Sequence, residues 1–393
     1  MKINLNCQNL CVEPESIRGV QVYMRELINN YTYGLTMDYS LSVFDYRKER
    51  GNVSLLLKNL GKEKTIPRII ECNTLSYQEI LKAYDRNDYS YAARTYEDYL
   101  GEEFDIVHVP SPFGIPHNIH SKTIVTIHDV IPLYESTQKD FGIGVLRRKD
   151  DLEFIRDAEN IVCIADSEST KKDLIELLDY PEKKINVIHL GFETSKRLSE
   201  IDEKKILSKN NLEAKQFILY VGAVENRKGV SVLIQAYKTI LTQYRGVKLL
   251  LAGRVVPAYR EELSRLVSDL PDGSVKVMGF VDDTTRDVLL ANAKFLVLPS
   301  FAEGFGIPVL EAMQYGTPVI ASNVTSLPEV GGLAAEYFEV GNVEQLAEKM
   351  EWLLQDEGKC ESMGIVGLER CKEFSWKKMA QETEELYKRV YNQ

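Results

Sequence analysis

The sequence lacks any hydrophobic run that approaches the roughly 20 residues needed to cross a bilayer. Its first eleven residues also lack the sustained apolar stretch of a signal peptide. We therefore expect a cytoplasmic protein. The six cysteines include no Cys-x-x-Cys pair and no histidine at the spacing of a zinc site. Reduced, mostly buried thiols are expected in place of disulfides or a structural metal.

Positive charge is also scarce. The chain carries 48 Lys and Arg against 59 Asp and Glu, which gives a formal net charge of −11. This balance argues against nucleic acid or an anionic membrane as a bulk electrostatic partner. A local basic patch is still compatible with transient peripheral contact at a membrane, and the oligomeric state is left open. No internal repeat and no low-complexity segment is evident.

The chain is long enough for two domains of ordinary size, because it has 393 residues of which 44% are hydrophobic. Short apolar runs alternate with helical patterns, which is typical of an α/β protein. Residues 194–215 are charged and almost free of long apolar runs, so we place the domain boundary there. Residues 14–19 read Pro-Glu-Ser-Ile-Arg-Gly and lack the Gly-x-Gly-x-x-Gly of a dinucleotide-binding domain.

In the first half, two compact runs at 104–109 and 123–127 have the β-branched composition of buried parallel strands. The second run is followed by His128 and Asp129. Because ligands of open α/β sheets bind beyond the carboxyl ends of strands, His128 is placed to take part in a site. A histidine in a loop is more often simply exposed or hydrogen-bonded, and on the residues alone both interpretations stay open.

Residues 76–100 predict a long helix that is unusually rich in tyrosine. Aromatic amphipathic surface is concentrated in this half of the chain, because 13 of the 21 tyrosines precede residue 194. Helix packing with polar tips is the interpretation that we favour, and an acceptor platform is the alternative.

In the second half, a strand at 217–221 is followed by a turn that carries Arg227 and Lys228 side by side. Two cations at a strand-to-helix turn can neutralise a diphosphate, and a guanidinium can contact phosphate oxygens in a bidentate manner. The ordinary alternative for such a pair is solvated surface. At a later turn, Asp282 and Asp283 fit a helix cap better than a metal site.

The most informative stretch begins with an apolar strand at 294–299 and continues into a glycine loop. Pro308 suits the first position of a helix, so Gly304 and Gly306 should lie just ahead of a helix N-terminus. Glycines let the backbone approach a ligand closely, while free N–H groups and the helix dipole attract an anion. An isolated Gly-x-Gly, however, more often only turns the chain.

Two carboxylates flank this predicted anion site, Glu303 before the loop and Glu311 in the first turn or so of the helix. Carboxylates repel phosphate but accept hydrogen bonds from hydroxyl groups. We therefore expect both side chains to bind sugar hydroxyls.

The complete string is far more specific than its glycines. It resembles the Glu-x7-Glu signature of retaining glycosyltransferases of family 4, which have the GT-B fold, and it matches at Glu303, Gly304, Phe305, Gly306, Ile307, Pro308, Glu311, Ala312 and Met313. Three more segments are similar to family elements: Gly-x-x-x-x-Arg-Lys-Gly at 222–229, Thr-x-His-Asp at 126–129 and Ser-x-Pro-Glu-Val at 326–330. The resemblance is strong over residues 217–330 and patchy before them.

The resemblance implies two Rossmann-like domains that face each other across an interdomain cleft. Residues 1–193 would form an acceptor-binding domain and residues 194–375 the nucleotide-sugar donor-binding domain. Residues 376–393 would form a terminal helix that packs back on the first domain.

The reaction that the resemblance implies is hexosyl transfer from a UDP- or GDP-linked nucleotide sugar to a hydroxyl group of a carbohydrate or lipid-linked acceptor. The anomeric configuration would be retained, without a metal or another cofactor. Cell-surface polysaccharide or glycan synthesis is the expected context. The rival functions are a non-catalytic partner subunit that binds nucleotide sugar and a sugar-nucleotide epimerase of the same fold.

Matched residue by residue, the resemblance implies catalytic roles for His128, Arg227, Lys228 and Glu303. Arg227 and Lys228 would hold the donor diphosphate, Glu303 the donor sugar and Glu311 the ribose. The implied donor contacts are Gly19, Arg227, Lys228, Arg254, Phe280, Val281, Glu303, Gly304, Phe305, Gly306, Ile307 and Glu311, with no metal ligand.

Overall fold

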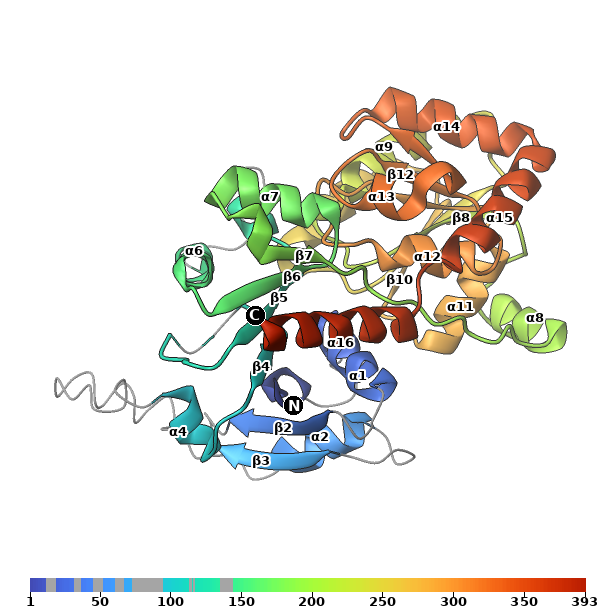
Figure 1. Cartoon of the computed structure of the whole chain (residues 1–393). Coiled ribbons are helices and arrows are strands. Elements are labelled where there is room, and N and C mark those ends of the chain that lie inside the picture. Colours follow the sequence, from blue (N-terminus) through green and yellow to red (C-terminus); the bar gives the residue numbers. More distant parts are fainter. Residues whose placement is uncertain are drawn as a thin grey trace. The chain divides into compact units, whose positions relative to one another are not determined.

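The computed structural model describes residues 1–11, 19–31, 37–44, 52–60, 67–72, 95–112, 115, 117–134 and 144–393. The chain forms two compact units (Figure 1). Unit 1 contains residues 1–191 and 375–393, and unit 2 contains residues 192–374. The sequence placed its boundaries after residues 193 and 375. The acceptor and donor roles of the two units stay predictions.

Unit 1 is built on a parallel sheet with the strand order β3-β2-β1-β4-β5-β6-β7. Every residue of β4 and β5 is buried, as expected for central strands whose two faces are both covered by helices. The chain leaves β1 toward one edge and returns to β4 on the other side of β1, so β1 and β4 flank the switch point of the topology. The strands are β1 (Lys2–Asn6), β2 (Asp38–Phe44), β3 (Arg68–Cys72), β4 (Ile106–Val109), β5 (Thr123–Ile127), β6 (Ile161–Ala165) and β7 (Ile185–Val187).

The last helix of the chain, α16, belongs to unit 1, where it lies beside α1 (Figure 1). Leu386, Tyr387 and Val390 of α16 join the same hydrophobic core as Leu5 of β1. The helix begins where the sequence predicted, because Ser375 caps it by accepting a hydrogen bond from the N–H of Lys378. The helices of unit 1 are α1 (Val20–Asn30), α2 (Asn52–Leu60), α4 (Tyr96–Leu100), α6 (Gly144–Asp157), α7 (Glu168–Leu178) and α16 (Trp376–Asn392).

The tyrosine-rich helix predicted at 76–100 falls largely on residues 73–94, which lie outside the described residues. The prediction is wrong at its carboxyl end, because a new helix starts at Tyr96. Thr95 has an extended backbone and forms a capping box with Asp98, which ends any preceding helix at that point.

Unit 2 repeats the architecture with the strand order β10-β9-β8-β11-β12-β13, again entirely parallel. This order matches the first six strands of unit 1, so both units are Rossmann-like. Here β8 and β11 flank the switch point. The strands are β8 (Phe217–Val221), β9 (Lys248–Ala252), β10 (Val275–Gly279), β11 (Phe295–Leu298), β12 (Val319–Ser322) and β13 (Ala335–Phe338).

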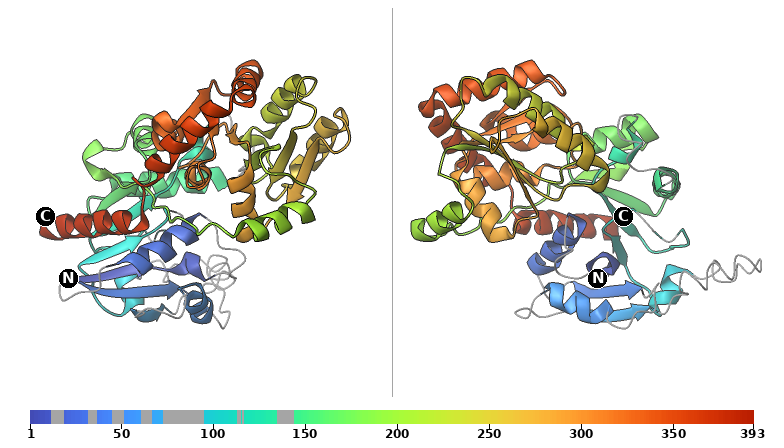
Figure 2. Two further views of the ribbon diagram at one scale, coloured as in Figure 1. Left: turned by 90° about the vertical axis from the view of Figure 1, so that its right-hand side faces the viewer. Right: turned by 180° about the vertical axis from the view of Figure 1, so that it is seen from behind.

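The helices of unit 2 cover its sheet, with α9 packed against α14 and α8 packed against α11 (Figure 2). Asp282 caps α11 by accepting a hydrogen bond from the N–H of Thr285, which confirms the predicted cap. The helices are α8 (Glu200–Lys209), α9 (Val230–Ile240), α10 (Arg260–Ser268), α11 (Asp283–Asn292), α12 (Ile307–Met313), α13 (Leu327–Gly331), α14 (Val343–Gln355) and α15 (Glu357–Cys371).

Four of the six cysteines are buried, which confirms the predicted burial, and all six are free thiols in this structure. Across the described ranges, no helix is both long enough and apolar enough to span a membrane.

Candidate active site

Most of the predicted donor residues follow the carboxyl ends of β8 and β11. These two strands pair directly, with Phe295 opposite Ile218. Each is followed by one of the two loops singled out in the sequence, 222–229 after β8 and 299–306 after β11. Neighbouring strands at a topological switch point leave a crevice at their carboxyl ends, which is where ligands of such sheets bind.

A close backbone contact holds the two loops together. Gly229 has a φ of +63°, and a Cβ atom at this position would lie 1.9 Å from the carbonyl oxygen of Pro299. Only glycine fits there. The N–H of Phe301 also donates a 2.9 Å hydrogen bond to the carbonyl oxygen of Arg227. The cations of the first loop are therefore held against the second loop.

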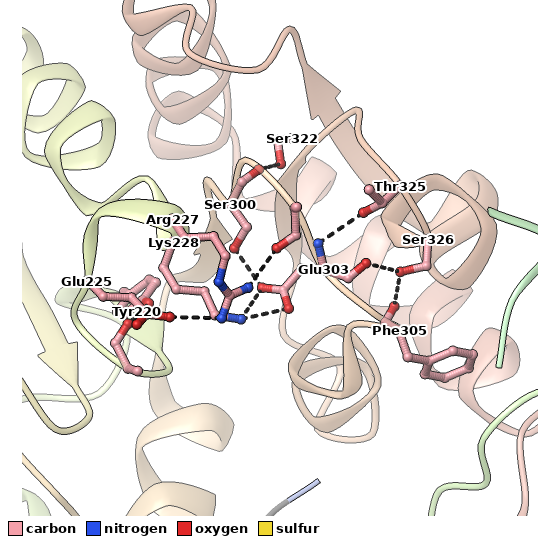
Figure 3. A network of polar contacts seen from close by, with 12 residues as sticks. Tyr220, Glu225, Arg227, Lys228, Ser300, Glu303, Phe305, Ser322, Thr325 and Ser326 are labelled. Carbon is pink, nitrogen blue, oxygen red and sulfur yellow. Dashed lines mark hydrogen bonds and ion pairs between the residues drawn. The ribbon is translucent and has the colours of Figure 1, made fainter. Parts of the chain in front are cut away.

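Lys228 and Glu303 form an ion pair across the loops (Figure 3). The Lys228 Nζ lies 2.7 Å from both Oε1 and Oε2 of Glu303. Ser300 Oγ donates a third hydrogen bond, of 2.6 Å, to Glu303 Oε1. Because the Lys228 and Glu303 side chains are only 17% and 12% exposed, water screens this pair weakly.

The protonation state of Glu303 follows from these contacts. Burial opposes the charged carboxylate, but the Lys228 ammonium, with Ser300 and Arg227, outweighs burial and holds the pKa of Glu303 below its ordinary value. The carboxylate is therefore ionised and can accept hydrogen bonds from hydroxyl groups through its remaining lone pairs.

Arg227 is held in place by two contacts (Figure 3). One guanidinium nitrogen lies 2.8 Å from Oε1 of Glu225, and another donates a 3.0 Å hydrogen bond to the carbonyl oxygen of Ala302. The side chain is 17% exposed. Sequence reasoning assigned no role to Glu225, although this residue lies only two positions before Arg227 in the same motif.

Residues after β12 support the glycine loop. The N–H of Glu303 donates to Thr325 Oγ1 at 3.1 Å, and Ser326 Oγ donates to the carbonyl oxygen of Phe305 at 2.8 Å (Figure 3). Among the described residues, the N–H groups of Gly304 and Gly306 have no hydrogen-bond partner. The segment 326–330, recognised from the family resemblance, thus has a structural task in buttressing the loop.

The helix after the loop differs in detail from the expectation. It begins at Ile307 behind Gly306, whose φ is +103°, so Pro308 occupies the second helical position and not the first. Proline is tolerated in both positions, since neither N–H has an intrahelical acceptor. As a result, Glu311 lies in the second turn of this seven-residue helix.

Glu311 has a neighbour that the sequence did not suggest. The Arg286 guanidinium of α11 lies 3.6 Å from Glu311 Oε1, and the buried Arg286 Nε has no hydrogen-bond partner in the described part of the chain. Burial raises the pKa of Glu311, because Arg286 compensates for it only in part. No sequence motif marks Arg286; only the packing of α11 against α12 brings it here.

Three further predicted donor residues lie at the carboxyl ends of β9 and β10 in the same sheet. Arg254 is exposed, and its carbonyl oxygen accepts a hydrogen bond from the N–H of Val224. Phe280 is 65% exposed and Val281 is half-buried. An exposed aromatic ring at this edge is suited to stacking on a planar ligand.

The remaining two predicted residues belong to unit 1. Gly19 precedes α1 with a φ of +37°, and among the described residues no atom lies within 4 Å of where a Cβ atom would be. His128 follows β5, and its ring is held by residues that follow the strands on either side. The Nδ1 atom lies 2.6 Å from Oδ2 of Asp166, and Nε2 lies 3.0 Å from the carbonyl oxygen of Pro110.

These contacts determine what His128 can do. A carbonyl oxygen can only accept, so Nε2 carries a proton, and the second proton lies between Nδ1 and Asp166. Burial opposes a charged imidazole, but the Asp166 carboxylate outweighs it and raises the pKa of His128. In this arrangement neither nitrogen is free to take up a proton from a substrate. Asp166 could have been found from the sequence, because it follows the predicted strand beside that of His128.

Two family models match this chain. A model described as glycosyl transferases group 1 matches residues 202–370, and one described as glycosyltransferase family 4 matches residues 17–196. The O-antigen chain mannosyltransferase B of Escherichia coli is 31% identical over 306 residues, which are 76% of this chain and 76% of that protein. The chain belongs to the group 1, family 4 glycosyltransferases.

A second relative is much longer than the present chain. The serotype-specific mannosyltransferase WbdA of Escherichia coli is 30% identical over 69% of this chain. The match covers 35% of WbdA, so the present chain spans about a third of that protein.

Solved structures show which fold the glycosyltransferase has. A sucrose-phosphate synthase from Thermosynechococcus elongatus has a TM-score of 0.73 at 21% identity and covers 100% of this chain and 99% of its own. The Anabaena protein HepE, in complex with UDP-glucose, has a TM-score of 0.69 at 18% identity, with 98% and 99% covered. At these identities the likeness concerns the fold, and it confirms the predicted two-domain GT-B architecture.

Proposed function

We propose that this glycosyltransferase moves a hexosyl group from a nucleotide sugar to a hydroxyl group of a carbohydrate or lipid-linked acceptor, with retention of the anomeric configuration. The observation that carries the proposal is the cluster of Arg227, Lys228 and Glu303 at the switch point of unit 2. It combines cations suited to a diphosphate with a carboxylate suited to sugar hydroxyls.

The comparisons support the substrate class. HepE, a protein of the same fold, binds UDP-glucose, and the relative at 31% identity is an O-antigen chain mannosyltransferase. We propose cell-surface polysaccharide synthesis as the context, and mannose and glucose as the first sugars to test. The UDP- and GDP-linked donors remain the leading candidates.

The chemical argument starts from the leaving group. When the bond to the anomeric carbon breaks, negative charge builds up on the nucleoside diphosphate. Cations fixed beside that position stabilise the transition state more than the ground state, which lowers the barrier. Arg227 and Lys228 are already oriented by Glu225 and Glu303. We propose that these two side chains supply the positive charge that a metal ion supplies in other transferases.

The carboxylates take the other parts of the donor. Ionised Glu303 would orient the sugar hydroxyls while the anomeric centre gains positive charge. Glu311 would accept hydrogen bonds from the ribose. The exposed Phe280 is placed to lie against the base.

We propose that His128 contributes a fixed ring beside the reacting sugar and does not act as a base. Both ring nitrogens already face acceptors, Asp166 and the carbonyl oxygen of Pro110. The proton of the acceptor hydroxyl must then go elsewhere, and we propose that the departing phosphate oxygen takes it on the same face of the sugar. This route retains the anomeric configuration without a covalent intermediate on the protein.

The experiment that tests the proposal is release of nucleoside diphosphate from a panel of UDP- and GDP-linked hexoses, with and without oligosaccharide or lipid-linked acceptors. The proposal predicts steady, acceptor-dependent release with at least one donor. A protein that binds a nucleotide sugar but never releases the diphosphate would be a binding subunit. Conversion of the donor into an isomeric nucleotide sugar would identify an epimerase.

A further inference from the structure

A continuous series of hydrogen bonds crosses the core of unit 1 from α16 to the strand that carries His128. Tyr387 Oη lies 2.6 Å from His108 Nδ1, and His108 Nε2 lies 2.8 Å from Thr126 Oγ1. Thr126 Oγ1 in turn lies 2.9 Å from Tyr23 Oη. All four side chains are at most 2% exposed. Direct hydrogen bonds thereby connect residues that lie up to 364 positions apart in the sequence (Tyr23 and Tyr387).

The members of this chain depend on one another. Burial, with the nearby His128, lowers the pKa of His108 to about 3, so its imidazole is neutral and has one donor and one acceptor nitrogen. His108 therefore donates to one of its two hydroxyl neighbours and accepts from the other. Loss of the Tyr387 hydroxyl leaves His108 Nδ1 without this partner in the core.

The series ends against the ring of His128. The Tyr23 ring meets the His128 ring edge-on, with centroids 5.0 Å apart and planes at 77°. Thr126 lies two residues before His128 on β5. The series thus fixes both the strand end from which His128 projects and the aromatic wall beside it. Asp166 and Pro110 fix only its nitrogen atoms.

Other bonds attach α16 to unit 1 without leading to His128. Tyr39 of β2 donates a 2.8 Å hydrogen bond to Glu384, and both of these residues are at most 5% exposed. The Lys122 ammonium donates to the carbonyl oxygens of Val390 and Tyr391. Tyr387 also attaches α16, because its hydroxyl lies 2.6 Å from that of Tyr31. Tyr39 and Lys122, in contrast, hold α16 without belonging to the series that leads to His128.

We propose that Tyr387 is a positioning residue that acts through His108, Thr126 and Tyr23 to hold His128 in the orientation needed for sugar transfer. The proposal rests on the proposed function, in which His128 takes part in the reaction. Tyr387 lies beyond residue 370, outside both matched family models. Helix α16 would then affect the rate of sugar transfer in addition to packing in the core of unit 1.

The first test compares Tyr387→Phe with Tyr39→Phe in the full-length protein. Both substitutions remove one buried tyrosine hydroxyl that bonds to or from α16, and both keep the ring. Tyr387→Phe should lower kcat by about 10- to 100-fold, the scale expected when a reacting group is slightly misplaced. Tyr39→Phe should leave kcat nearly unchanged. The KM for the donor should change little in both, because the donor is held by Arg227, Lys228 and Glu303.

A second variant guards against a trivial folding defect. Thr126→Val breaks the same series at another point, so combining it with Tyr387→Phe should lower kcat no further than the stronger single change. Combining Thr126→Val with Tyr39→Phe should give the product of the two single effects. Equal losses of kcat in Tyr387→Phe and Tyr39→Phe, or multiplicative losses in Tyr387→Phe with Thr126→Val, overturn the proposal.

A spectroscopic readout separates this proposal from the proposed function. The chain has five histidines, so carbon-13 labelling of their rings gives a spectrum simple enough to assign by substitution. Tyr387→Phe should shift the His128 signal, and Tyr39→Phe should leave it in place. An unchanged His128 signal in Tyr387→Phe contradicts the positioning role even if the protein turns over. A protein without any turnover removes the proposed function, while the spectra still decide whether the series positions His128.

Discussion

The Lys228 ammonium lies 2.7 Å from each carboxylate oxygen of Glu303, in an ion pair that joins the loops after β8 and β11. The cation that should face a diphosphate is paired with the carboxylate that should face the sugar. Each residue therefore holds the other in position, and a substitution at one of them changes the charge around both.

The first prediction concerns the stability of this pair. Lys228→Met or Glu303→Gln should each lower the free energy of unfolding by about 1.5–3 kcal/mol, because each leaves a weakly hydrated partner without its charged hydrogen bonds. The double variant should lose less unfolding free energy than the sum of the two single losses. Urea denaturation of the four proteins measures this coupling. The control is the exposed Lys238–Asp269 pair, at 3.2 Å, for which a coupling of only about 0–1 kcal/mol is expected.

The two glutamates should differ in the step that they affect. Glu311→Gln should weaken binding of the nucleoside diphosphate by roughly 5- to 150-fold, since it removes one of the two carboxyl oxygens that would accept from ribose hydroxyls. Glu303→Gln should lower turnover without weakening diphosphate binding, because it removes the counter-ion of Lys228 and acts at the reacting sugar. Calorimetry and turnover of both variants check this division. Equal losses of diphosphate affinity would overturn it.

The chemistry at the leaving group predicts that no metal is needed. Because Arg227 and Lys228 supply the positive charge, treatment with a strong chelator should leave turnover nearly unchanged. The measurement is the rate of diphosphate release before and after chelation and dialysis. Loss of activity that returns on addition of magnesium or manganese would assign the charge to a metal.

The buried His108 should make the free energy of unfolding depend on pH. With its pKa lowered to about 3 by burial, His108 stays neutral in the folded protein at pH values where the unfolded chain, with a pKa near 6.5, takes up a proton. The unfolded state then binds more protons, so stability falls as the pH falls from about 6.5 toward 3, by about 1.4 kcal/mol per pH unit from this group.

Substitution of His108 isolates this contribution. His108→Gln cannot take up a proton, so the stability difference between wild type and variant should shrink by about 1.4 kcal/mol for each pH unit between pH 6 and pH 4. Urea denaturation at several pH values provides the comparison. A stability difference that stays constant with pH would show that His108 is also protonated in the folded protein.

The sequence predicted the compact apolar strands and missed three strands of mixed composition. The runs at 123–127 and 217–221 coincide with β5 and β8, because central parallel strands are buried on both faces. The strands β2, β3 and β13 were not predicted. Their sequences mix polar and apolar residues, as in Asp38–Phe44, and β3 and β13 form edges of their sheets, where less apolar surface is buried.

The candidate site likewise contains residues that the sequence predicted and residues that it did not. The loops with Arg227, Lys228 and Glu303 were predicted because their spacing matches a family pattern. Their partners arise from contacts that no local pattern encodes: Arg286 reaches Glu311 only through helix packing. Tyr387 bonds to His108 across 279 positions of the sequence, which only the folded core brings together.

The central claim is that unit 2 binds a nucleoside diphosphate through Arg227 and Lys228, and calorimetric titration tests it most directly. UDP, GDP, ADP and dTDP are titrated into wild type, into the double variant Arg227→Met with Lys228→Met, and into the surface control Lys238→Met. At least one diphosphate should bind wild type and the control equally, with one site per chain. The double variant should bind at least about 100-fold more weakly, since two charged hydrogen-bond donors are lost. Failure of wild type to bind any of the four, or equal affinity in the double variant, would contradict the account.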